Sequence, residues 1–444
     1  MKLKKILTLS SFIIILTVIT GCALDKAPEE MIKRPKLSEE DRRIEELINR
    51  NIPQNAKYES VESEQGLSAI KMIDIDGDGS DEILVTYALD IDKDPLHLII
   101  FRKKNDSYSF MNDLSVKGQE FDKLIMRDIN GNGKKDLVTI SSDSNKKILT
   151  IYSYQSDIKK LLEIDYTVFV MDDIDEDGIV DIIVFKNIND ILTGDYYKYN
   201  PESEEMEFIN ETINYIRFDS MQEPIIDYIS KGKKGIILQG NDGNESTRYT
   251  LIFSINEFGK LENAIKDSTE EGGNITAHLS TENPDFKIKD VNKDGIVEIP
   301  RVYSMIEKEE GFILNKDDYI FCTEWYEFRN NKMEKSITNI YLESDRVYFA
   351  YPKNWEDIEI TGKKIKTQEG EKYRFSKRDP ENSKEELLLT IIKAKSVPDK
   401  SYRLIKRDGK FGYYIKAEKN IQNENIKDLQ VDESSIIKSF QIKK

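Results

Sequence analysis

The chain has 444 residues, of which 38% are hydrophobic and 34% charged, a composition typical of folded globular protein rather than of a disordered chain. The length is sufficient for two or three domains, because single cores rarely grow beyond about 250 to 300 residues. The net charge of −17 and the pI near 4.9 argue against nucleic-acid binding, since phosphates would be repelled.

Residues 1–21 are interpreted as an export signal. Basic residues precede an apolar run from Ile6 to Thr20, which is short for a membrane span. The run ends in Thr20-Gly21-Cys22, which resembles the bacterial lipobox, where a small residue precedes a cysteine that is lipidated and becomes the mature N-terminus. The resemblance implies a lipidated Cys22 and a protein anchored to the bacterial cell membrane, facing outside the cytoplasm. The alternatives are an ordinary secretory signal and an N-terminal anchor with a chance cysteine.

Residues 22–58 predict a lipidated tether followed by one short amphipathic helix. Residues 23–36 hold Pro28 and Pro35 among charged residues, and Ser38 then offers an N-cap followed by acids in the first turn. The helix is expected to end before Pro53 and to present one apolar face, formed by Ile44, Leu47 and Ile48.

Beyond residue 58, short apolar runs rich in β-branched and aromatic residues predict strands. A nine-residue acidic pattern recurs among them, with acids or amides at positions 1, 3, 5 and 9 and glycine at position 6. Its ninth residues are Glu82, Asp136, Asp181 and Glu298, which lie 54, 45 and 117 residues apart. The widest gap can contain a further unit that has lost its acids, with Gly235 in the ninth position.

This spacing is typical of a loop that surrounds Ca²⁺. The ion takes six to eight oxygens at about 2.3 to 2.6 Å, and the glycine permits the sharp turn around it. A backbone carbonyl is expected at position 7. The expected ligands are Asp74, Asp76, Asp78, Ser80 and Glu82; Asp128, Asn130, Asn132, Lys134 and Asp136; Asp173, Asp175, Asp177, Ile179 and Asp181; and Asp290, Asn292, Asp294, Ile296 and Glu298.

An EF-hand begins with the same residues but needs a bidentate Glu at position 12. Here that position holds Val85, Thr139, Val184 or Arg301, and the residues that follow each loop read as strands. Paired loops between helices, as in a dockerin, are disfavoured for the same reason. The remaining alternative is a solvated Asp/Gly turn without an ion.

A period of about 40 to 50 residues with four strands per unit indicates a β-propeller. In the second unit the strands are expected at residues 121–127, 136–141, 148–154 and 160–166. The pattern resembles the FG-GAP/VCBS-type repeats of integrin α-chain propellers and bacterial surface proteins. Over residues 59–340 the resemblance implies a β-propeller with up to four structural Ca²⁺ ions between the first two strands of its blades. Five blades fit this length best.

The number of acids predicts how tightly each loop binds calcium. The first and third loops have four acids each and are expected to bind most tightly. The loop that begins at Asp290 follows, and the second loop, with Asn130 and Asn132, is expected to bind most weakly. Once Cys22 is acylated, Cys322 is the one cysteine left, so no intrachain disulfide can form and calcium would act as the staple.

Residues 341–444 hold 23 basic and 18 acidic residues, whereas the rest of the chain is strongly acidic. This shift predicts a boundary near residue 340 and a small α+β domain after it. Its start, "FAYPKNW", weakly resembles PsbP/Mog1-like domains. Tyr351, Pro352 and Trp355 either line a ligand surface or, as we favour, belong to the core. The basic stretches 363–366 and 403–410 either face an anionic cell-wall polymer or, as we favour, are simply solvated.

These features together predict a mainly β, calcium-binding, membrane-anchored surface lipoprotein that acts as a non-catalytic scaffold for a protein or glycan ligand. The alternative is a glycoside hydrolase with paired carboxylates in the propeller channel. Against catalysis, the chain has two histidines, His97 and His278, and no G-x-S-x-G, H-E-x-x-H or P-loop motif. A structural or regulatory envelope subunit that works with a protein partner is a third possibility.

Overall fold

The computed structural model describes residues 38–90, 94–104, 107–144, 146–155, 157–189, 191–241, 243, 247–265, 276–279, 286–306, 319–330, 332–378, 384–419 and 426–443. The predicted signal, Cys22 and most of the tether lie outside these residues. The described residues divide into two compact units, one within 38–74 and 78–117 and one within 75–77 and 118–443. Within the described residues, no helix is long and apolar enough to cross a membrane.

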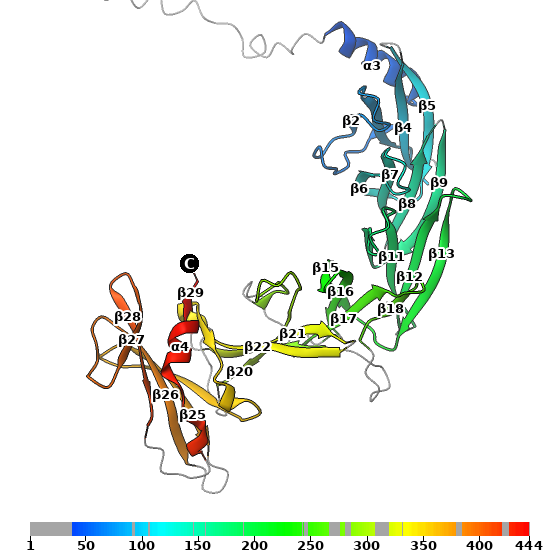
Figure 1. Ribbon diagram of the computed structural model, residues 1–444. Coiled ribbons are helices and arrows are strands. Elements are labelled where there is room, and N and C mark those ends of the chain that lie inside the picture. Colours follow the sequence, from blue (N-terminus) through cyan, green and yellow to red (C-terminus); the bar gives the residue numbers. More distant parts are fainter. Residues whose placement is uncertain are drawn as a thin grey trace, which may run out of the picture. The chain divides into compact units, whose positions relative to one another are not determined.

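The first unit contains the predicted helix, α3 (Glu39–Asn51), and a five-stranded antiparallel sheet (Figure 1). Ser38 caps the helix, because its hydroxyl accepts from the Asp41 amide at 3.0 Å while the Asp41 carboxylate accepts from the Ser38 amide. Ile48 is buried against the sheet core. The strands are β1 (Lys57–Tyr58), β2 (Ile70–Ile73), β3 (Glu82–Ala88), β4 (Leu96–Lys104) and β5 (Ser107–Val116).

The second unit begins with two four-stranded antiparallel sheets whose strands follow chain order. The first sheet is β6 (Glu120–Arg127), β7 (Asp136–Asp143), β8 (Lys146–Tyr154) and β9 (Ile158–Tyr166), which confirms the strands expected for the second repeat. The next sheet is β10 (Val168–Asp172), β11 (Asp181–Ile188), β12 (Ile191–Asn200) and β13 (Glu205–Asn214).

A six-stranded sheet follows, where the repeat without acids was expected. It consists of β14 (Ser220–Met221), β15 (Ile225–Ser230), β16 (Lys233–Asn241), β17 (Thr247–Ile255), β18 (Leu261–Asn263) and β19 (Thr276–Leu279). The fourth sheet of this unit is β20 (Ile299–Ser304), β21 (Ile320–Arg329), β22 (Lys332–Leu342), β23 (Val347–Ala350) and β29 (Gln441–Ile442). The chain therefore returns at its C-terminal end to pair with β23.

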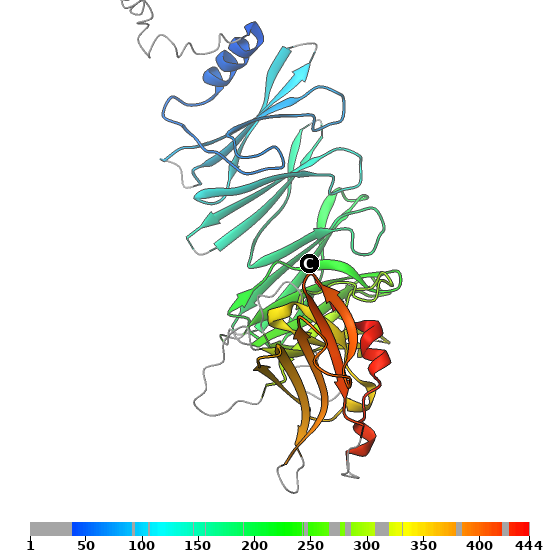
Figure 2. The same ribbon diagram turned by 90° about the vertical axis from the view of Figure 1, so that its left-hand side faces the viewer.

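The last sheet has the order β24-β25-β26-β28-β27, with the short helix α4 (Glu433–Ser439) near β23 and β28 (Figure 2). Its strands are β24 (Thr361–Lys366), β25 (Glu371–Arg378), β26 (Glu385–Ala394), β27 (Arg403–Asp408) and β28 (Phe411–Ala417). Strands with a short helix agree with the α+β expectation for this segment. The boundary predicted near residue 340 falls inside β22 and stays a prediction.

Hydrophobic clusters join consecutive sheets of the second unit. Val138 and Ile151 of one sheet share a cluster with Ile182 and Val184 of the next. Similar clusters connect β10–β13 to β14–β18, β15–β17 to β20–β22, and β21–β23 to β24–β28 and α4. A mainly β fold of successive antiparallel sheets is confirmed. The closed five-bladed propeller stays a prediction. Each of these clusters joins sheets that follow one another along the chain, and such contacts do not test whether the sheets close into a ring.

Candidate functional site

The four acidic patterns all form tight turns that lead into a strand. We call residues 74–82, 128–136, 173–181 and 290–298 turns one to four. In each, the amide of the glycine at position 6 donates to the carboxylate at position 1, over 2.7 to 3.0 Å. That glycine has φ between +82° and +90°, a conformation that other residues rarely adopt. The role expected for glycine at position 6 is thus confirmed in all four turns.

The residues expected to offer carbonyls at position 7 also share one geometry. The amides of Ser80, Lys134, Ile179 and Ile296 donate to the side-chain oxygen at position 5, over 2.7 to 3.0 Å. Positions 1, 5 and 7 are therefore drawn together in each turn by hydrogen bonds within it. Whether the carbonyls ligate an ion stays a prediction.

The ninth acid of every turn is buried; it starts a strand in turns one to three and directly precedes β20 in turn four. Glu82, Asp136, Asp181 and Glu298 are each 0% exposed. In turns two, three and four this acid accepts from the amide at position 2, with Ile129 to Asp136 at 3.0 Å, Ile174 to Asp181 at 2.7 Å and Val291 to Glu298 at 2.7 Å. Burial raises the pKa of Asp136, Asp181 and Glu298, and these amide hydrogen bonds oppose that rise. A buried carboxylate of this kind is stable only with further donors or a cation nearby.

Turns two and three, both in the second unit, are linked by a backbone hydrogen bond. The amide of Val180, at position 8 of turn three, donates to the carbonyl of Ile129, at position 2 of turn two, at 3.2 Å. Ile129 thus binds the ninth acid of its own turn through its amide and the next turn through its carbonyl. A change in how an acidic turn is held would therefore be transmitted to the contact between sheets.

The repeat without acids departs from this scheme in a consistent way. Gly235 replaces the ninth acid, and Ile229 Cδ1 lies 2.6 Å from where a Cβ on Gly235 would be. The side chain of Lys234 donates to the Asp173 carbonyl of turn three at 3.0 Å, so a side-chain amine takes the place of the usual backbone donor. Tyr228 then accepts from the amide of Val297 at 3.0 Å through its carbonyl. Ile229 and Lys234 therefore make the contacts of this repeat with its neighbour, whereas the other repeats use acids.

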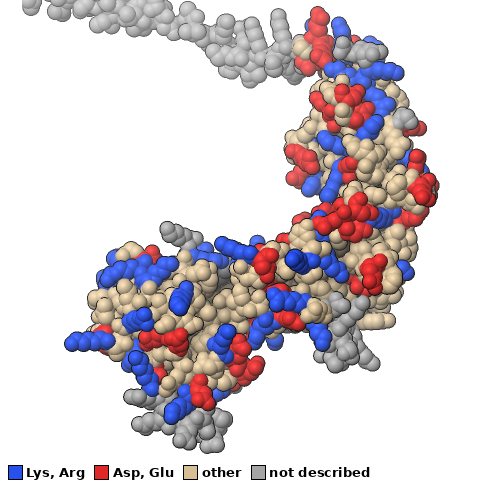
Figure 3. Space-filling view, viewed as in Figure 1, with Lys and Arg blue, Asp and Glu red and all other residues tan. Residues whose placement is uncertain are grey.

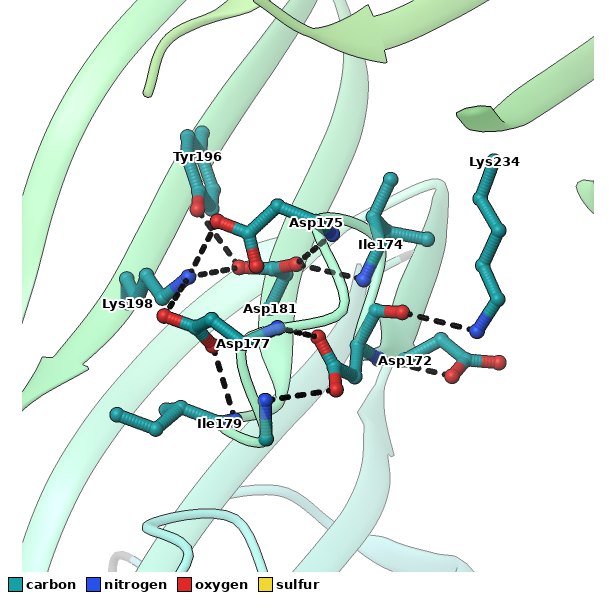
Figure 4. A network of polar contacts seen from close by, with 11 residues as sticks. Asp172, Ile174, Asp175, Asp177, Ile179, Asp181, Tyr196, Lys198 and Lys234 are labelled. Atoms are coloured by element: carbon teal, nitrogen blue, oxygen red, sulfur yellow. Dashed lines mark hydrogen bonds and ion pairs between the residues drawn. The ribbon is translucent and has the colours of Figure 1, made fainter. Parts of the chain in front are cut away.

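In turn three the carboxylates surround a lysine (Figure 4). Lys198, which pairs with Asp181 across β11 and β12, places Nζ 2.6 Å from Asp175, 2.9 Å from Asp177 and 3.3 Å from Asp181. The Tyr196 hydroxyl also donates to Asp181 at 2.6 Å. Burial disfavours the charged forms of Asp177 and Lys198. The contact between them nevertheless holds the pKa of Asp177 below its usual value, and the carboxylates raise the pKa of Lys198.

Turn four has an additional carboxylate where turn three has a lysine. Glu327 of β21 lies across from Glu298, one position beyond the paired residues Ile299 and Tyr326. It is 1% exposed, and within the described residues its Oε2 has no hydrogen-bond partner. Its Oε1 contacts Arg329, whose side chain is 55% exposed. The negative charge of Glu327 contributes to the raised pKa of Glu298, after burial.

Oxygens of Asp290, Asp294 and Glu298 come within 4.8 Å of one another, as do those of Asp173, Asp175 and Asp181 in turn three and of Asp74, Asp76 and Asp78 in turn one. Asn292 donates to Asp294 and Glu298 in turn four, but this neutral amide does not compensate their charge. In turn one, strand register places Arg102 across from the ninth acid. Hard, closely spaced oxygens with uncompensated charge suit Ca²⁺, so turn four fits this ion.

Turn two is held by neutral groups. Asp136 Oδ1 accepts from the Tyr154 amide at 3.2 Å and from Asn130 at 3.4 Å, and Asn130 also donates to Ser153 at 3.2 Å. Asp128 accepts from the amides of Asn132 and Gly133. These donors satisfy most of the oxygens in the turn, in keeping with the expectation that it binds calcium most weakly.

The residue across from the ninth acid was missed by sequence reasoning. Strand register places Arg102, Ser153, Lys198 and Glu327 at this position for turns one to four, so its charge varies from positive to neutral to negative. It lies outside the nine-residue pattern. This facing residue can be identified only from the pairing of the strand that follows each turn with the next strand along the chain.

Other residues singled out in the sequence are placed as follows. Trp355 is fully buried and donates through Nε1 to the Leu429 carbonyl at 2.9 Å, which confirms that it belongs to the core. Tyr351 lines a cavity of about 350 Å³ together with Tyr303, Glu324 and Lys335. His97 stacks on Tyr87 in the first unit, and Cys322 is buried.

The basic stretch 403–410 includes β27, whose side chains are mostly exposed. On the face seen in Figure 3, the Lys and Arg side chains of the C-terminal part are mixed with Asp and Glu rather than gathered alone. This mixture agrees with a solvated face for 403–410. In the stretch 363–366 the expectation is wrong for Lys364, whose side chain is 4% exposed and donates to Ser344 at 2.9 Å.

Comparison with known proteins adds little. No family model matches the sequence, and no curated protein matches it. Among solved structures, the crystal structure of exotype rhamnogalacturonan lyase YesX is similar, with a TM-score of 0.28 and 11% identity. The similarity covers 76% of this chain and 65% of that chain, so the match spans less than two thirds of the lyase. A likeness this distant carries no argument about function.

Proposed function

We propose that this protein is a calcium-binding, membrane-anchored surface lipoprotein that serves as a non-catalytic scaffold for a protein or glycan ligand. Its successive sheets are proposed to be the blades of an FG-GAP/VCBS-like propeller. Calcium is proposed to act as a structural staple in the acidic turns, and lipid on Cys22 to hold the protein at the outer face of the bacterial cell membrane.

The observation that carries this proposal is the carboxylate cluster of turn four. Asp290, Asp294 and Glu298 bring their oxygens within 4.8 Å of one another, and strand register places a fourth acid, Glu327, across from Glu298, with one largely exposed arginine, Arg329, beside it. Concentrating this much charge around buried groups is unfavourable unless a cation is bound. The residues that would hold calcium are Asp290, Asn292, Asp294 and Glu298, with the Ile296 carbonyl at position 7.

A structural role is supported by where the turns lie. The amide and carbonyl of Ile129 connect the ninth acid of turn two with turn three, so an ion that orders turn two would also order the contact between these sheets. An ion that binds only the folded state stabilises it in proportion to ligand excess. The cavity beside Tyr303 and Tyr351 is a candidate place for the ligand, because aromatic faces next to the Glu324–Lys335 ion pair suit a polar ring such as a sugar.

The test is thermal unfolding of the full-length protein in detergent, with calcium and with a chelator, alongside glycan-array and pull-down screens of the calcium-loaded form. We expect the chelator to lower the melting temperature and magnesium to restore it poorly. The matched variant is Asp290→Asn/Asp294→Asn, which should respond less to chelator than the wild type. An unchanged melting temperature and no bound metal in the purified protein would reject the calcium role. Turnover of a glycoside substrate would reject the non-catalytic role.

A further inference from the structure

The acids that the calcium pattern assigns to positions 3, 5 and 9 of turn three already surround a positive charge. Nζ of Lys198 lies 2.6 Å from Asp175, 2.9 Å from Asp177 and 3.3 Å from Asp181. The lysine side chain is 16% exposed, so its charge is largely removed from solvent. The ammonium of Lys198 therefore forms ion pairs with three carboxylates and donates a hydrogen bond to that of Asp175 (Figure 4).

A calcium ion in this turn would need the same oxygens that Lys198 contacts. The ion and the ammonium repel each other, and the lysine would have to leave its partners before the carboxylates could turn to a metal. Turn four offers no such obstacle, because its cross-strand residue is Glu327 and its cluster is more negative. Calcium therefore does not fit turn three as the structure has it.

We propose that turn three holds the ammonium of Lys198 as a built-in cation in place of a divalent ion. This extends the proposed function, since it divides the turns into calcium-dependent and calcium-independent ones. The junction after turn three is also held by groups of the chain itself, with Lys234 on the Asp173 carbonyl and Tyr228 on the Glu176 carboxylate at 2.6 Å. This part of the protein would keep its structure when calcium is scarce.

The experiment measures bound calcium per chain by equilibrium dialysis with radioactive calcium, on full-length protein in detergent. Lys198→Met removes the ammonium and keeps an unbranched side chain. We expect this variant to bind one more calcium ion per chain than the wild type. Lys186→Met is the matched control, because Lys186 makes an ion pair with Asp195 at 3.0 Å in the same sheet but outside the turn. Its calcium count should equal that of the wild type.

A double substitution in the turn tests the proposal further, and its wild-type arm can be measured even if Lys198→Met does not fold. Asp175→Asn/Asp177→Asn in the wild-type background should leave the calcium count unchanged, whereas in the Lys198→Met background it should remove the additional ion. The proposal is overturned if the wild type loses one ion with these substitutions, or if folded Lys198→Met gains none. If the wild type bound no calcium, the proposed staple role would be rejected. In that case, a gain of one ion in Lys198→Met would still support the inference about turn three.

Discussion

Turns three and four have nearly the same backbone and differ in the residue that faces their ninth acid. In both, the glycine at position 6 donates to the first carboxylate and the amide at position 2 donates to the ninth. Lys198 faces Asp181, whereas Glu327 faces Glu298. The nine-residue pattern therefore sets the shape of the turn, while a residue on another strand sets the charge inside it. The same turn is suited to an internal cation in one case and to a metal in the other.

The largest expected effect comes from giving turn three the residue of turn four. Lys198→Glu would leave Asp175, Asp177 and Asp181 with an added acid and no cation. Breaking a mostly buried set of ion pairs in this way should cost about 3 kcal/mol of unfolding free energy in chelator. Because the new cluster resembles turn four, added calcium should restore most of the loss. Urea unfolding at matched ionic strength, with and without calcium, measures both quantities.

Lys186→Glu is the control for that substitution. It breaks an ion pair in the same sheet, with Asp195, and should destabilise the protein equally in calcium and in chelator. If Lys198→Glu behaved in the same way, the residue facing the ninth acid would have no influence on which cation the turn holds.

The reverse exchange is expected to have the next largest effect. Glu327→Lys would place an ammonium beside Glu298, and turn four should then release its calcium. A site at 100-fold excess of calcium over its dissociation constant contributes about 2.7 kcal/mol, so the calcium-dependent stability should fall by roughly this amount. Bound calcium should also fall by one ion per chain. Glu327→Gln, which removes the charge but adds none, should weaken binding without abolishing it; equal calcium counts in Glu327→Lys and the wild type would contradict the comparison.

Local features of the fold were predictable from the sequence because their causes are local. Ser38 and the acids after it marked the start of α3, and the glycines at position 6 marked the four turns. Gly235, which spacing aligned with the ninth acids, lies on β16 opposite Asp227 of β15, but Ile229 filling the space beside it could not be foreseen. Spacing along the chain identifies such positions without stating what packs there.

The residues that distinguish the turns were not predictable for a physical reason. Lys198 and Glu327 lie 17 and 29 residues after their acids, and the hairpins between have different lengths. A shift of one residue in register would point either side chain to the other face of the sheet. The pairing of β29 with β23 is likewise set by contacts between distant segments. The amino-acid composition did not indicate that β29 pairs with β23.

The smallest expected effect tests whether turn three is independent of metal. The hydroxyl of Tyr196, which is 1% exposed, donates to Asp181 at 2.6 Å beside Lys198. Tyr196→Phe removes one hydrogen bond to a carboxylate that keeps its lysine and its amide donors, and should cost about 1.5 kcal/mol. Since Lys198 remains, the loss should be the same in calcium and in chelator. Tyr197→Phe, on the other face of β12, is the control and should cost less. A loss for Tyr196→Phe that calcium reverses would mean that turn three binds the ion after all, because only a bound metal could substitute for the missing donor.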